Sequence, residues 1–370
     1  MKVLLLSCGT GEGHNSAGKA VMEALIERGV ECEFFDPIAL KSEKAKEKVS
    51  GTYNGVIRHV PMLFGIIYML GKLYSASPLP SPVMWANSKY ADELAAYIKE
   101  KGFDAVVSPH IFTMQAMLAV RKKHNINIPV YCIMTDYTVI PFFVDGKDLD
   151  YHYAPNEKLK YKLMKMGFEE EKIYPVGIPV SPKFNLDITK KEARASLGLD
   201  ENKKLVMIMT GGAGCGNIKK ICKKLLKKAD DSVIIYVFCG RNEKLYKKIT
   251  EYFPEERVRA VGFTDKIYMY MKAADVVLSK AGGLSSTEVA VANVPFVHLK
   301  AIPGCESYNI KYFTKNRLSL LGNTASRAAK RTVELLENSE LCEEIKKNQK
   351  ELIPSNASSI IADMVLKGKE

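Results

Sequence analysis

Two glycine-rich segments follow apolar, strand-like runs and carry residue types that bind anions. The first, Ser7–Ala20, reads SCGTGEGHNSAGKA and follows Val3–Leu6. A glycine turn between a strand and a helix presents backbone N–H groups to a phosphate, and Asp36 lies roughly where a dinucleotide fold keeps its ribose-binding acid. His14, however, stands where the third glycine of the dinucleotide fingerprint is required for close helix–strand packing. The pattern therefore argues against a nicotinamide-dependent dehydrogenase.

Histidine at position 14 brings a different chemistry to the first segment. An imidazole with a pKa near 6.5 can act as a general base at neutral pH, although a lone histidine is often a structural hydrogen-bonding group. Asp136 follows the apolar run Val130–Met134 and could orient His14, contact a substrate or simply shape a turn. His110, in the sequence SPHIF, ends another strand and is a reserve candidate.

The second segment, Ser279–Leu299, reads SKAGGLSSTEVAVANVPFVHL and gives the strongest local signal. Gly282 and Gly283 allow a ligand to approach the backbone closely, and the N–H groups of residues 284–286 would face a diphosphate at a helix N-terminus. Glu288, one turn into the helix, could accept both hydroxyls of a ribose. The alternative is an ordinary capped helix, in which the helix dipole stabilises the Glu288 carboxylate near the N-terminus.

Three weaker motifs lie in the same half of the chain. Met209–Asn217 is a glycine-rich loop after a strand, where positive φ angles and close approach to a substrate are tolerated. Val261–Asp265 reads VGFTD and could present backbone groups to a flat base. Pro303–Asn309 reads PGCESYN and offers Glu306 and Asn309 to a polyhydroxylated ligand.

These motifs must be positioned by two α/β halves. At 370 residues the chain is long enough for two domains, and Tyr174–Phe184, dense in proline and glycine, is a predicted linker. A helix is predicted from Ser16 through Glu27. Short β-rich runs alternating with helical ones predict two Rossmann-like domains, each with a parallel sheet, facing a cleft. The predicted strands are Lys2–Ser7, Glu31–Phe35, Ala105–Ser108, Val130–Met134, Lys204–Thr210, Ser232–Cys239, Val258–Val261, Val276–Leu278 and Phe296–His298.

Composition favours an intracellular protein with anionic partners. Lysine and arginine number 54 against 42 acidic residues, a net charge of +12. The densest lysine run, residues 219–228, predicts an amphipathic helix without interleaved aromatic residues, which argues against nucleic-acid binding. The eight cysteines occur singly and predict reduced thiols. No window is long and apolar enough for a spanning helix, and the first apolar run is too short for a signal peptide.

One apolar segment, Val56–Pro82, stands apart from the strand–helix alternation. It carries a dense aliphatic and aromatic cluster with basic residues at its edges. It could pack as an ordinary core or lid helix, or lie at the interface of an anionic membrane. The run Pro61–Leu70 is too short to span a bilayer.

The order of the motifs resembles the family 28 glycosyltransferases of the GT-B fold, in the monogalactosyldiacylglycerol synthase and processive diacylglycerol glucosyltransferase branch. GTGEGHNSAGKA, TDY at 135–137, YPVGIPV, TGGAGCGN, SKAGGLSSTE and PGCESYN carry the likeness across nearly the whole chain. The tandem glutamines of the more distant peptidoglycan N-acetylglucosaminyltransferase are not matched, since the aligned positions are Cys305 and Glu306.

The resemblance implies a metal-independent, inverting transfer of glucose or galactose from a UDP-sugar to a membrane lipid, with diacylglycerol as the expected acceptor and no cofactor. Alternatives are a polyprenyl or other lipid acceptor, or a non-catalytic UDP-sugar-binding protein. The only literal D-x-D, residues 148–150, lies outside a plausible loop context for a metal. The expected location is cytoplasmic, at the inner face of the cell membrane.

The implied domains are 1–178 for a membrane-facing acceptor domain, 179–352 for a donor domain, and 353–370 for a helix returning toward the first. His14 is the implied base, with Asp136 as a second catalytic candidate. The donor-binding candidates are Gly211, Gly212, Gly262, Phe263, Thr264, Lys280, Gly282, Gly283, Leu284, Ser285, Glu288, Glu306 and Asn309. The acceptor and membrane candidates are Gly13, Arg58, Met62, Phe64, Ile67, Tyr68 and Lys72.

Overall fold

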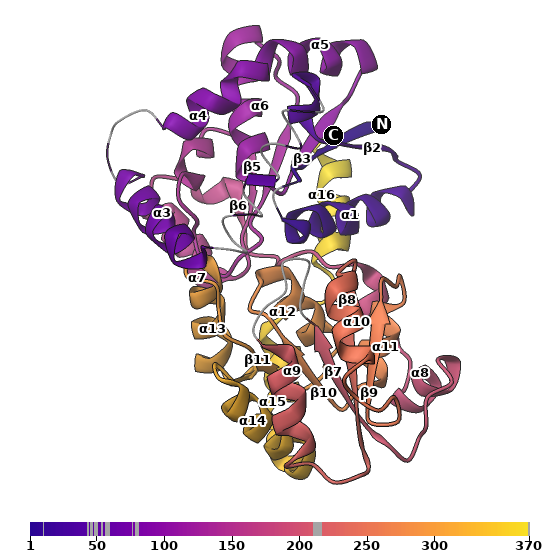
Figure 1. The fold of residues 1–370 in the computed structure, drawn as a ribbon. Helices are drawn as coiled ribbons and strands as arrows, with labels where there is room; N and C mark the ends of the chain where they lie inside the picture. Colours follow the sequence, from indigo (N-terminus) through magenta and orange to yellow (C-terminus); the bar gives the residue numbers. More distant parts are fainter. Residues whose placement is uncertain are drawn as a thin grey trace. The chain divides into compact units, whose positions relative to one another are not determined.

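The computed structural model describes residues 1–9, 11–42, 44, 47, 51–52, 55, 60–75, 77, 81–209 and 217–368, without the side chains of Pro61 and Phe64 (Figure 1). Its contacts divide the chain into two compact units. The first unit contains residues 1–182, 303–305 and 354–370, and the second contains 183–302 and 306–353.

The first unit is built on a six-stranded parallel sheet of order β2-β1-β3-β4-β5-β6. Its four longest strands match the runs predicted from sequence to within one residue, whereas β5 and β6 were not predicted. The strands are β1 (Lys2–Leu6), β2 (Glu31–Phe35), β3 (Ala105–Ser108), β4 (Val130–Ile133), β5 (Tyr151–Tyr153) and β6 (Ile173–Tyr174).

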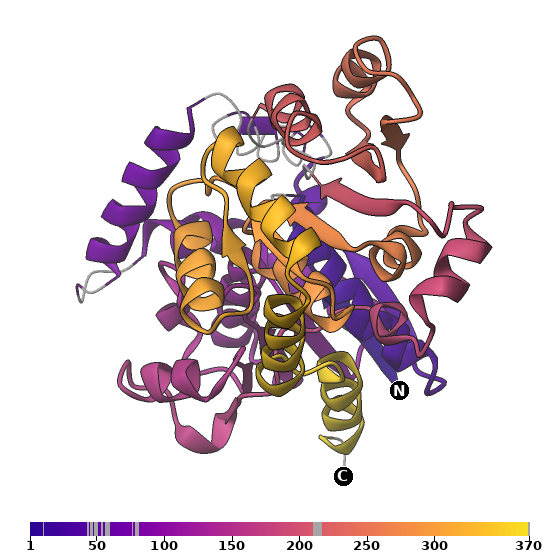
Figure 2. The same cartoon turned by 90° about the horizontal axis from the view of Figure 1, so that it is seen from below.

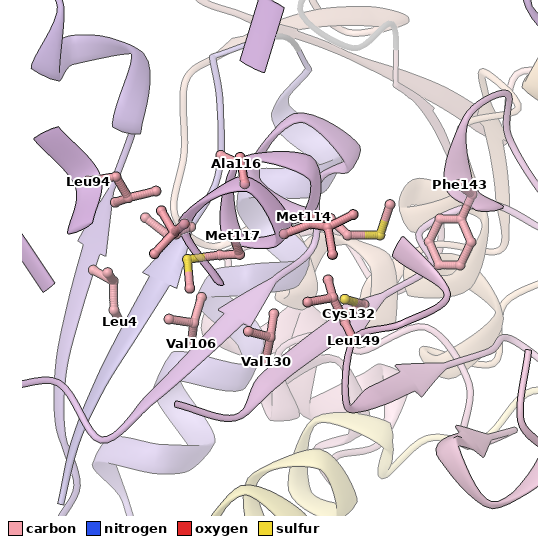
Figure 3. Packing of buried hydrophobic residues seen from close by; sticks show 14 of the residues in the cluster. Leu4, Leu94, Val106, Met114, Ala116, Met117, Val130, Cys132, Phe143 and Leu149 are labelled. Carbon is pink, nitrogen blue, oxygen red and sulfur yellow. The ribbon is translucent and has the colours of Figure 1, made fainter. Parts of the chain in front are cut away.

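Helices cover both faces of this sheet, which is why β3 and β4 are buried throughout and β1 is buried from Val3 onward. Successive side chains of β1 alternate between the faces: Leu4 and Leu6 pack in one core cluster, and Val3 and Leu5 pack in the other. Figure 3 shows the first cluster, where Leu94 from α5 and Met114 and Met117 from α6 meet the sheet. The helices and 3₁₀ turns of this unit are α1 (Glu12–Ile26), η1 (Pro37–Leu40), α3 (Pro61–Tyr74), α4 (Pro82–Asn87), η2 (Ser88–Tyr90), α5 (Ala91–Lys101), α6 (Ile111–His124), η3 (Phe143–Gly146), α7 (Glu157–Met164), η4 (Glu170–Lys172) and α16 (Ala357–Lys367).

Helix α1 begins at Glu12, four residues before the predicted start at Ser16. The backbone turns at Gly11, whose φ of 124° favours glycine. Gly13 and His14 therefore belong to the first helical turn and are not part of a loop.

The C-terminal helix α16 packs on the first unit beside α1. Ile361, Ala362 and Val365 are buried in the same cluster as Val21 and Leu25. Arg28 donates to the Ser359 hydroxyl at 2.5 Å and pairs with Asp363 at 2.7 Å. The last residues described thus complete a core that begins with the first strand.

The second unit contains another six-stranded parallel sheet, of order β12-β11-β10-β7-β8-β9. Helices α9 and α14 contribute to a core cluster with the sheet, which includes Val206, Ile208 and Val237. The short strand β12 was not predicted. The elements are η5 (Pro182–Asn185), α8 (Lys190–Ser196), β7 (Lys204–Met209), α9 (Ile218–Leu226), β8 (Val233–Gly240), α10 (Glu243–Thr250), β9 (Val258–Gly262), α11 (Ile267–Ala273), β10 (Val276–Ser279), α12 (Gly283–Val291), β11 (Phe296–His298), α13 (Cys305–Lys315), β12 (Leu320–Leu321), α14 (Ala325–Glu337) and α15 (Ser339–Leu352).

Replacing Ile361 by alanine tests whether α16 is part of the first core. The side chain is fully buried, so Ile361→Ala should lower the free energy of unfolding by about 2–5 kcal/mol in a urea titration followed by circular dichroism. The exposed Lys367 on the same helix provides the control, and Lys367→Ala should change it by less than about 0.5 kcal/mol. Equal stability of the two variants would show that α16 is not docked in solution.

Candidate active site

The strand order identifies one place in each sheet where loops can receive a ligand. β1 lies between β2 and β3, and β7 lies between β8 and β10, so the direction of strand addition reverses at these two strands. In open parallel sheets, ligands bind beyond the carboxyl ends of the strands at such a reversal. In the first sheet these ends lead to residues 7–14 and 109–110. In the second sheet they lead to residues 210–216, outside the described residues, and to residues 280–283.

His14 is held by two oxygens from distant parts of the first unit. Its Nδ1 atom lies 3.0 Å from the carbonyl oxygen of Pro109 and 2.8 Å from the hydroxyl oxygen of Thr135. Because a carbonyl oxygen can only accept, Nδ1 carries the proton in the neutral ring. The Nε2 atom then bears the lone pair that a general base requires.

His110 has a different hydrogen-bonding state from His14, although the two rings meet edge to face with centroids 4.5 Å apart. The Nδ1 atom of His110 accepts from the backbone N–H of Phe112 at 3.1 Å and caps helix α6. Burial, with a smaller contribution from His14, lowers the pKa of His110 well below its usual value. His110 is therefore a neutral capping group whose Nδ1 lone pair is already used, and this weakens its case as a base.

Asp136 is buried and lines the same pocket as His14, together with Thr135, Ile140 and Phe143. The hydroxyl of its neighbour Thr135 contacts His14, and the sequence alone did not indicate that hydroxyl. The Pro109 carbonyl was also missed, because a backbone oxygen leaves no trace in residue type.

Asp36 supports the first loop from inside the protein. Its carboxylate accepts from the backbone N–H of Gly9 at 3.1 Å and from that of Ile38 at 3.0 Å. A further bond joins the Ser7 hydroxyl to the Asn15 side chain at 2.7 Å. Asp36, which stands where a dinucleotide fold has its ribose-binding acid, thus fixes the loop before α1.

The second site centres on the N-terminus of α12, which begins at Gly283 after the N-cap Gly282. The N–H of Ser286 donates to the Gly282 carbonyl at 3.0 Å, so the prediction that this amide faces a ligand was wrong. The amides available in the first turn are those of residues 283–285, which have no hydrogen-bond partner among the residues the structure describes. Free amides at a helix N-terminus are groups that can bind an anion.

Lys280 adds a positive charge beside this helix terminus. A Cβ atom placed on Gly282 would lie 3.6 Å from the Lys280 ammonium and 4.0 Å from the Ser285 hydroxyl, so both groups converge on the glycine. Gly282 has an ordinary extended conformation that any residue could adopt. The relevance of glycine here is therefore its missing side chain, which leaves space beside Lys280 and Ser285.

Glu288 lies on α12, close to the amides of its first turn. Burial of its carboxyl group raises the pKa from 4.5 to about 8, although part of the side chain remains exposed. No hydrogen bond or ion pair to this carboxyl is found within the described part of the chain. The nearby Ser286 and Thr287 side chains point to protein instead: Ser286 bonds the buried His298 at 2.8 Å, and Thr287 donates to the Gly283 carbonyl at 2.8 Å.

Glu306 and Asn309 on α13 hold the loop that carries Lys280. Glu306 lies 3.6 Å from the Lys280 ammonium and accepts from the backbone N–H of Ile302 at 2.8 Å. Asn309 is fully buried and donates to the Ala281 carbonyl at 2.9 Å. The structure therefore brings both residues to the predicted donor site, where they bond to Lys280, Ile302 and Ala281 of the protein itself.

The predicted base-binding residues end the edge strand β9 of the second sheet. Phe263 is 71% exposed, and the Arg241 guanidinium lies 5.1 Å from its ring centroid. Gly262 pairs with Gly240 of β8, and the Thr264 hydroxyl accepts from Lys266 N–H at 3.1 Å. Among the described residues, no ring contact or hydrogen bond joins Phe263 to the cluster around α12. Gly211 and Gly212 lie outside the described residues.

The membrane candidates map to the outer face of α3 and to α1. Met62 and Ile67 are more than half exposed, Lys72 lies over the Tyr68 ring at 5.8 Å, and Gly13 is in the first turn of α1. Arg58 and the Phe64 side chain lie outside the described parts. None of the helices in the described ranges is both long and apolar enough to cross a bilayer.

The D-x-D sequence at 148–150 is tied into the first core. Arg121 pairs with Asp150 at 2.5 Å, Asp150 also accepts from Val130 N–H at 2.8 Å, and Leu149 is fully buried. Among the described residues, no group of three or more histidine, cysteine or acidic side chains has a metal-binding arrangement.

Comparisons with known proteins assign both units. Residues 14–180 match the monogalactosyldiacylglycerol synthase model, and residues 189–352 match the model for glycosyl transferases group 1. A processive diacylglycerol beta-glucosyltransferase of Bacillus pumilus is 26% identical over 98% of this chain and 94% of its own length.

Solved structures share the fold at low identity. MurG of Acinetobacter baumannii superposes with a TM-score of 0.61, 16% identity and 99% coverage of both chains. The UDP-GlcNAc 2-epimerase of Neisseria meningitidis gives a TM-score of 0.62 and 17% identity, covering 99% of this chain and 100% of its own.

Two parallel-sheet units with these matches define a glycosyltransferase of the GT-B fold. Its first unit matches the monogalactosyldiacylglycerol synthase model and its full-length relatives are named processive diacylglycerol glucosyltransferases, as the resemblance in the sequence implies. The family and the two-sheet architecture predicted from the sequence are thereby confirmed.

The raised pKa of Glu288 predicts a pH-dependent stabilisation by glutamine. Between pH 4.5 and 8 the folded protein holds a proton that the unfolded chain has lost, so the free energy of unfolding falls as pH rises. Glu288→Gln should remove this loss and stabilise the empty protein on the order of 2–4 kcal/mol by pH 8, with no difference below pH 4.5. Thermal unfolding across this pH range, compared with Glu334→Gln on α14, measures the effect; a pH-independent difference would contradict it.

Proposed function

We propose that this protein transfers a hexose from a UDP-sugar to the hydroxyl of diacylglycerol at a membrane surface, with inversion and without a metal ion. The observation that carries the proposal is the pair of built sites: a histidine with a defined lone pair in the first unit, and an anion-binding helix terminus beside a buried acid in the second. The relatives named as diacylglycerol glucosyltransferases favour glucose as the hexose.

The donor would bind at α12. The amides of residues 283–285 and the Lys280 ammonium would contact the diphosphate, where negative charge develops as the sugar leaves. The Glu288 carboxyl would accept the two ribose hydroxyls, which offsets the cost of burying its charge. Phe263 and the adjacent backbone would contact the uracil.

The acceptor hydroxyl would bind at His14. The Nε2 atom removes its proton, the hydroxyl oxygen bonds to the anomeric carbon, and the bond from that carbon to the diphosphate breaks. The bonding electrons leave with UDP. The Nδ1 proton, held by Pro109 and Thr135, keeps the ring in the required orientation throughout.

Helix α3 would bring the protein to its lipid. Seven of its apolar side chains are exposed: Met62, Leu63, Ile66, Ile67, Met69, Leu70 and Leu73. Its 14 residues span about 21 Å, less than the hydrocarbon core of a bilayer, so the helix would lie in the interface. Figures 1 and 2 show α3 set apart from the other helices of the first unit.

The inner face of α3 connects to the His14 pocket through one short segment. Gly71 lies against Pro141, and the Ser75 hydroxyl accepts from Phe142 N–H at 2.7 Å. Ile140 and Phe143, on either side of these residues, line the pocket with His14. This continuity within the first unit supports entry of the lipid from α3.

The donor and acceptor are tested by a screen of UDP-sugars against diacylglycerol presented in vesicles. Transfer from UDP-glucose or UDP-galactose to diacylglycerol is expected in the presence of a chelator. Activity only on a polyprenyl lipid or a soluble acceptor would contradict the acceptor assignment, and failure to bind UDP would contradict catalysis of this kind.

Removing the base should separate chemistry from donor binding. His14→Ala should lower kcat by roughly 10²–10⁴-fold, because the proton-accepting group is lost, while UDP affinity measured by calorimetry stays unchanged. Thr135→Val should lower kcat and shift its pH profile, and Thr135→Ser, which keeps the hydroxyl, should restore both. Full turnover by His14→Ala would exclude this residue as the base.

Polar substitutions on α3 should weaken membrane binding selectively. The triple variant Ile66→Ser, Ile67→Ser, Leu70→Ser should sediment with vesicles at least tenfold less than wild type and bind UDP equally well, because apolar area that would enter the interface is lost. The matched control replaces three exposed apolar residues elsewhere, Ile26, Leu186 and Leu352, by serine. Equal loss in both variants would remove the special role of α3.

A further inference from the structure

Helix α9 of the second unit carries a concentration of positive charge that the proposed donor site does not use. Six lysines lie on this helix and its C-terminal end, and no acidic residue occurs between Asn217 and Asp230. Ile218, Ile221, Cys222 and Leu225 are buried against the sheet, so the lysines occupy the opposite side. We call Lys219, Lys220, Lys223, Lys224, Lys227 and Lys228 the α9 lysine face.

No lysine of this face pairs with an acid among the residues that the structure describes. The nearest acids along the chain are engaged elsewhere: Asp230 accepts from Ser232, and Asp231 pairs with Arg257. The positive charge of the α9 lysine face is therefore not neutralised by ion pairs in the described part of the second unit.

The arrangement opposes the helix's own stability. Lysines repeat at i and i+4 in two rows, and like charges at that spacing repel. Lys219 and Lys220 also lie in the first turn, at the positive end of the helix dipole. A local arrangement that lowers folding stability is expected where an external partner compensates for it.

Tyr252, just beyond α10, extends the face and helps to define its partner. Its ring lies beneath two ammonium groups, with Lys219 and Lys223 at 3.1 and 4.4 Å from the centroid. The hydrogen bond and charge of Lys223 lower the pKa of Tyr252. These ammonium groups already contact the ring, which argues against its use as a stacking platform for a nucleobase.

We propose that the α9 lysine face binds the surface of a bilayer containing anionic phospholipids, as a membrane contact separate from α3. Charge complementarity carries this choice: two rows of lysines along one helix, with no acidic partner among the described residues, fit a planar array of phosphates. A single small anion instead needs groups that converge on one point. This membrane contact goes beyond the proposed function. It rests on the proposed function only in one respect, namely that a lipid-modifying enzyme must reach a membrane.

Vesicle sedimentation tests the face directly. Lys220→Gln, Lys224→Gln and Lys227→Gln should together reduce binding to vesicles with 30% phosphatidylglycerol by about fivefold per lysine. Binding to purely phosphatidylcholine vesicles should remain as in wild type. The loss should shrink as salt rises from 0.05 to 0.5 M, because salt screens exposed charges.

A charge-matched control separates this face from net charge. Lys311, Lys315 and Lys347 are exposed lysines on α13 and α15 of the same unit, and their replacement by glutamine should leave vesicle binding within about twofold of wild type. Equal loss in both triple variants, or no loss in the α9 variant, would overturn the proposal. Loss of affinity for a single-stranded RNA probe without loss of vesicle binding would overturn it in favour of nucleic acid.

A second readout distinguishes this proposal from the proposed function. Transfer from UDP-glucose to detergent-dispersed diacylglycerol should be the same in the α9 variant and in wild type, because no bilayer is involved. Absence of transfer in wild type would contradict the proposed function but leave the vesicle result standing. Loss of transfer in the α9 variant alone would assign these lysines to the active site and overturn the membrane role.

Discussion

The first strand of each parallel sheet in chain order, where strand addition changes side, determines where chemistry can occur in this molecule. After β1 and after β7, the chain first adds a strand on one side and later adds a strand on the other side. The loops that leave a sheet at such a strand diverge, and the space between them is open to a ligand. His14 and α12 both follow strands at these reversals, so the topology of the sheets, more than any single residue, brings together the groups from which function is inferred.

Side chains and backbone groups from elsewhere in each unit then fix the loops at these positions. Asp36 holds Gly9 in the first unit, and Asn309 holds Ala281 in the second. In each case a buried or partly buried polar side chain satisfies a backbone group that the fold would otherwise leave without a bond. Two residues that look like ligand-binding groups thus serve to keep a glycine loop in one conformation, which is the precondition for a precise site.

The sequence was informative where a physical requirement leaves a local pattern. Runs of β-branched and aliphatic residues predicted the long strands because both faces of each sheet are covered. The strands β6 and β12, of two residues each, are too short to show such a pattern. The start of α1 was predicted too late because Gly11 and Gly13 suggested a loop, although only Gly11 has a positive φ. Thr135 and the Pro109 carbonyl lie 121 and 95 residues from His14, and no local pattern signals contacts at that separation.

The protonation of Glu288 has a consequence for how an anionic ligand approaches the second unit. With a pKa near 8, the carboxyl is mostly uncharged at neutral pH while the site is empty. A diphosphate approaching the amides of α12 therefore meets the field of Lys280 and the helix dipole without repulsion from this acid. In the proposed donor complex, ribose hydroxyls would donate to the ionised carboxylate, and release of its proton would make donor binding stronger as pH rises. The same acid would then leave the empty site attractive to an anion and give the filled site a preference for a diol.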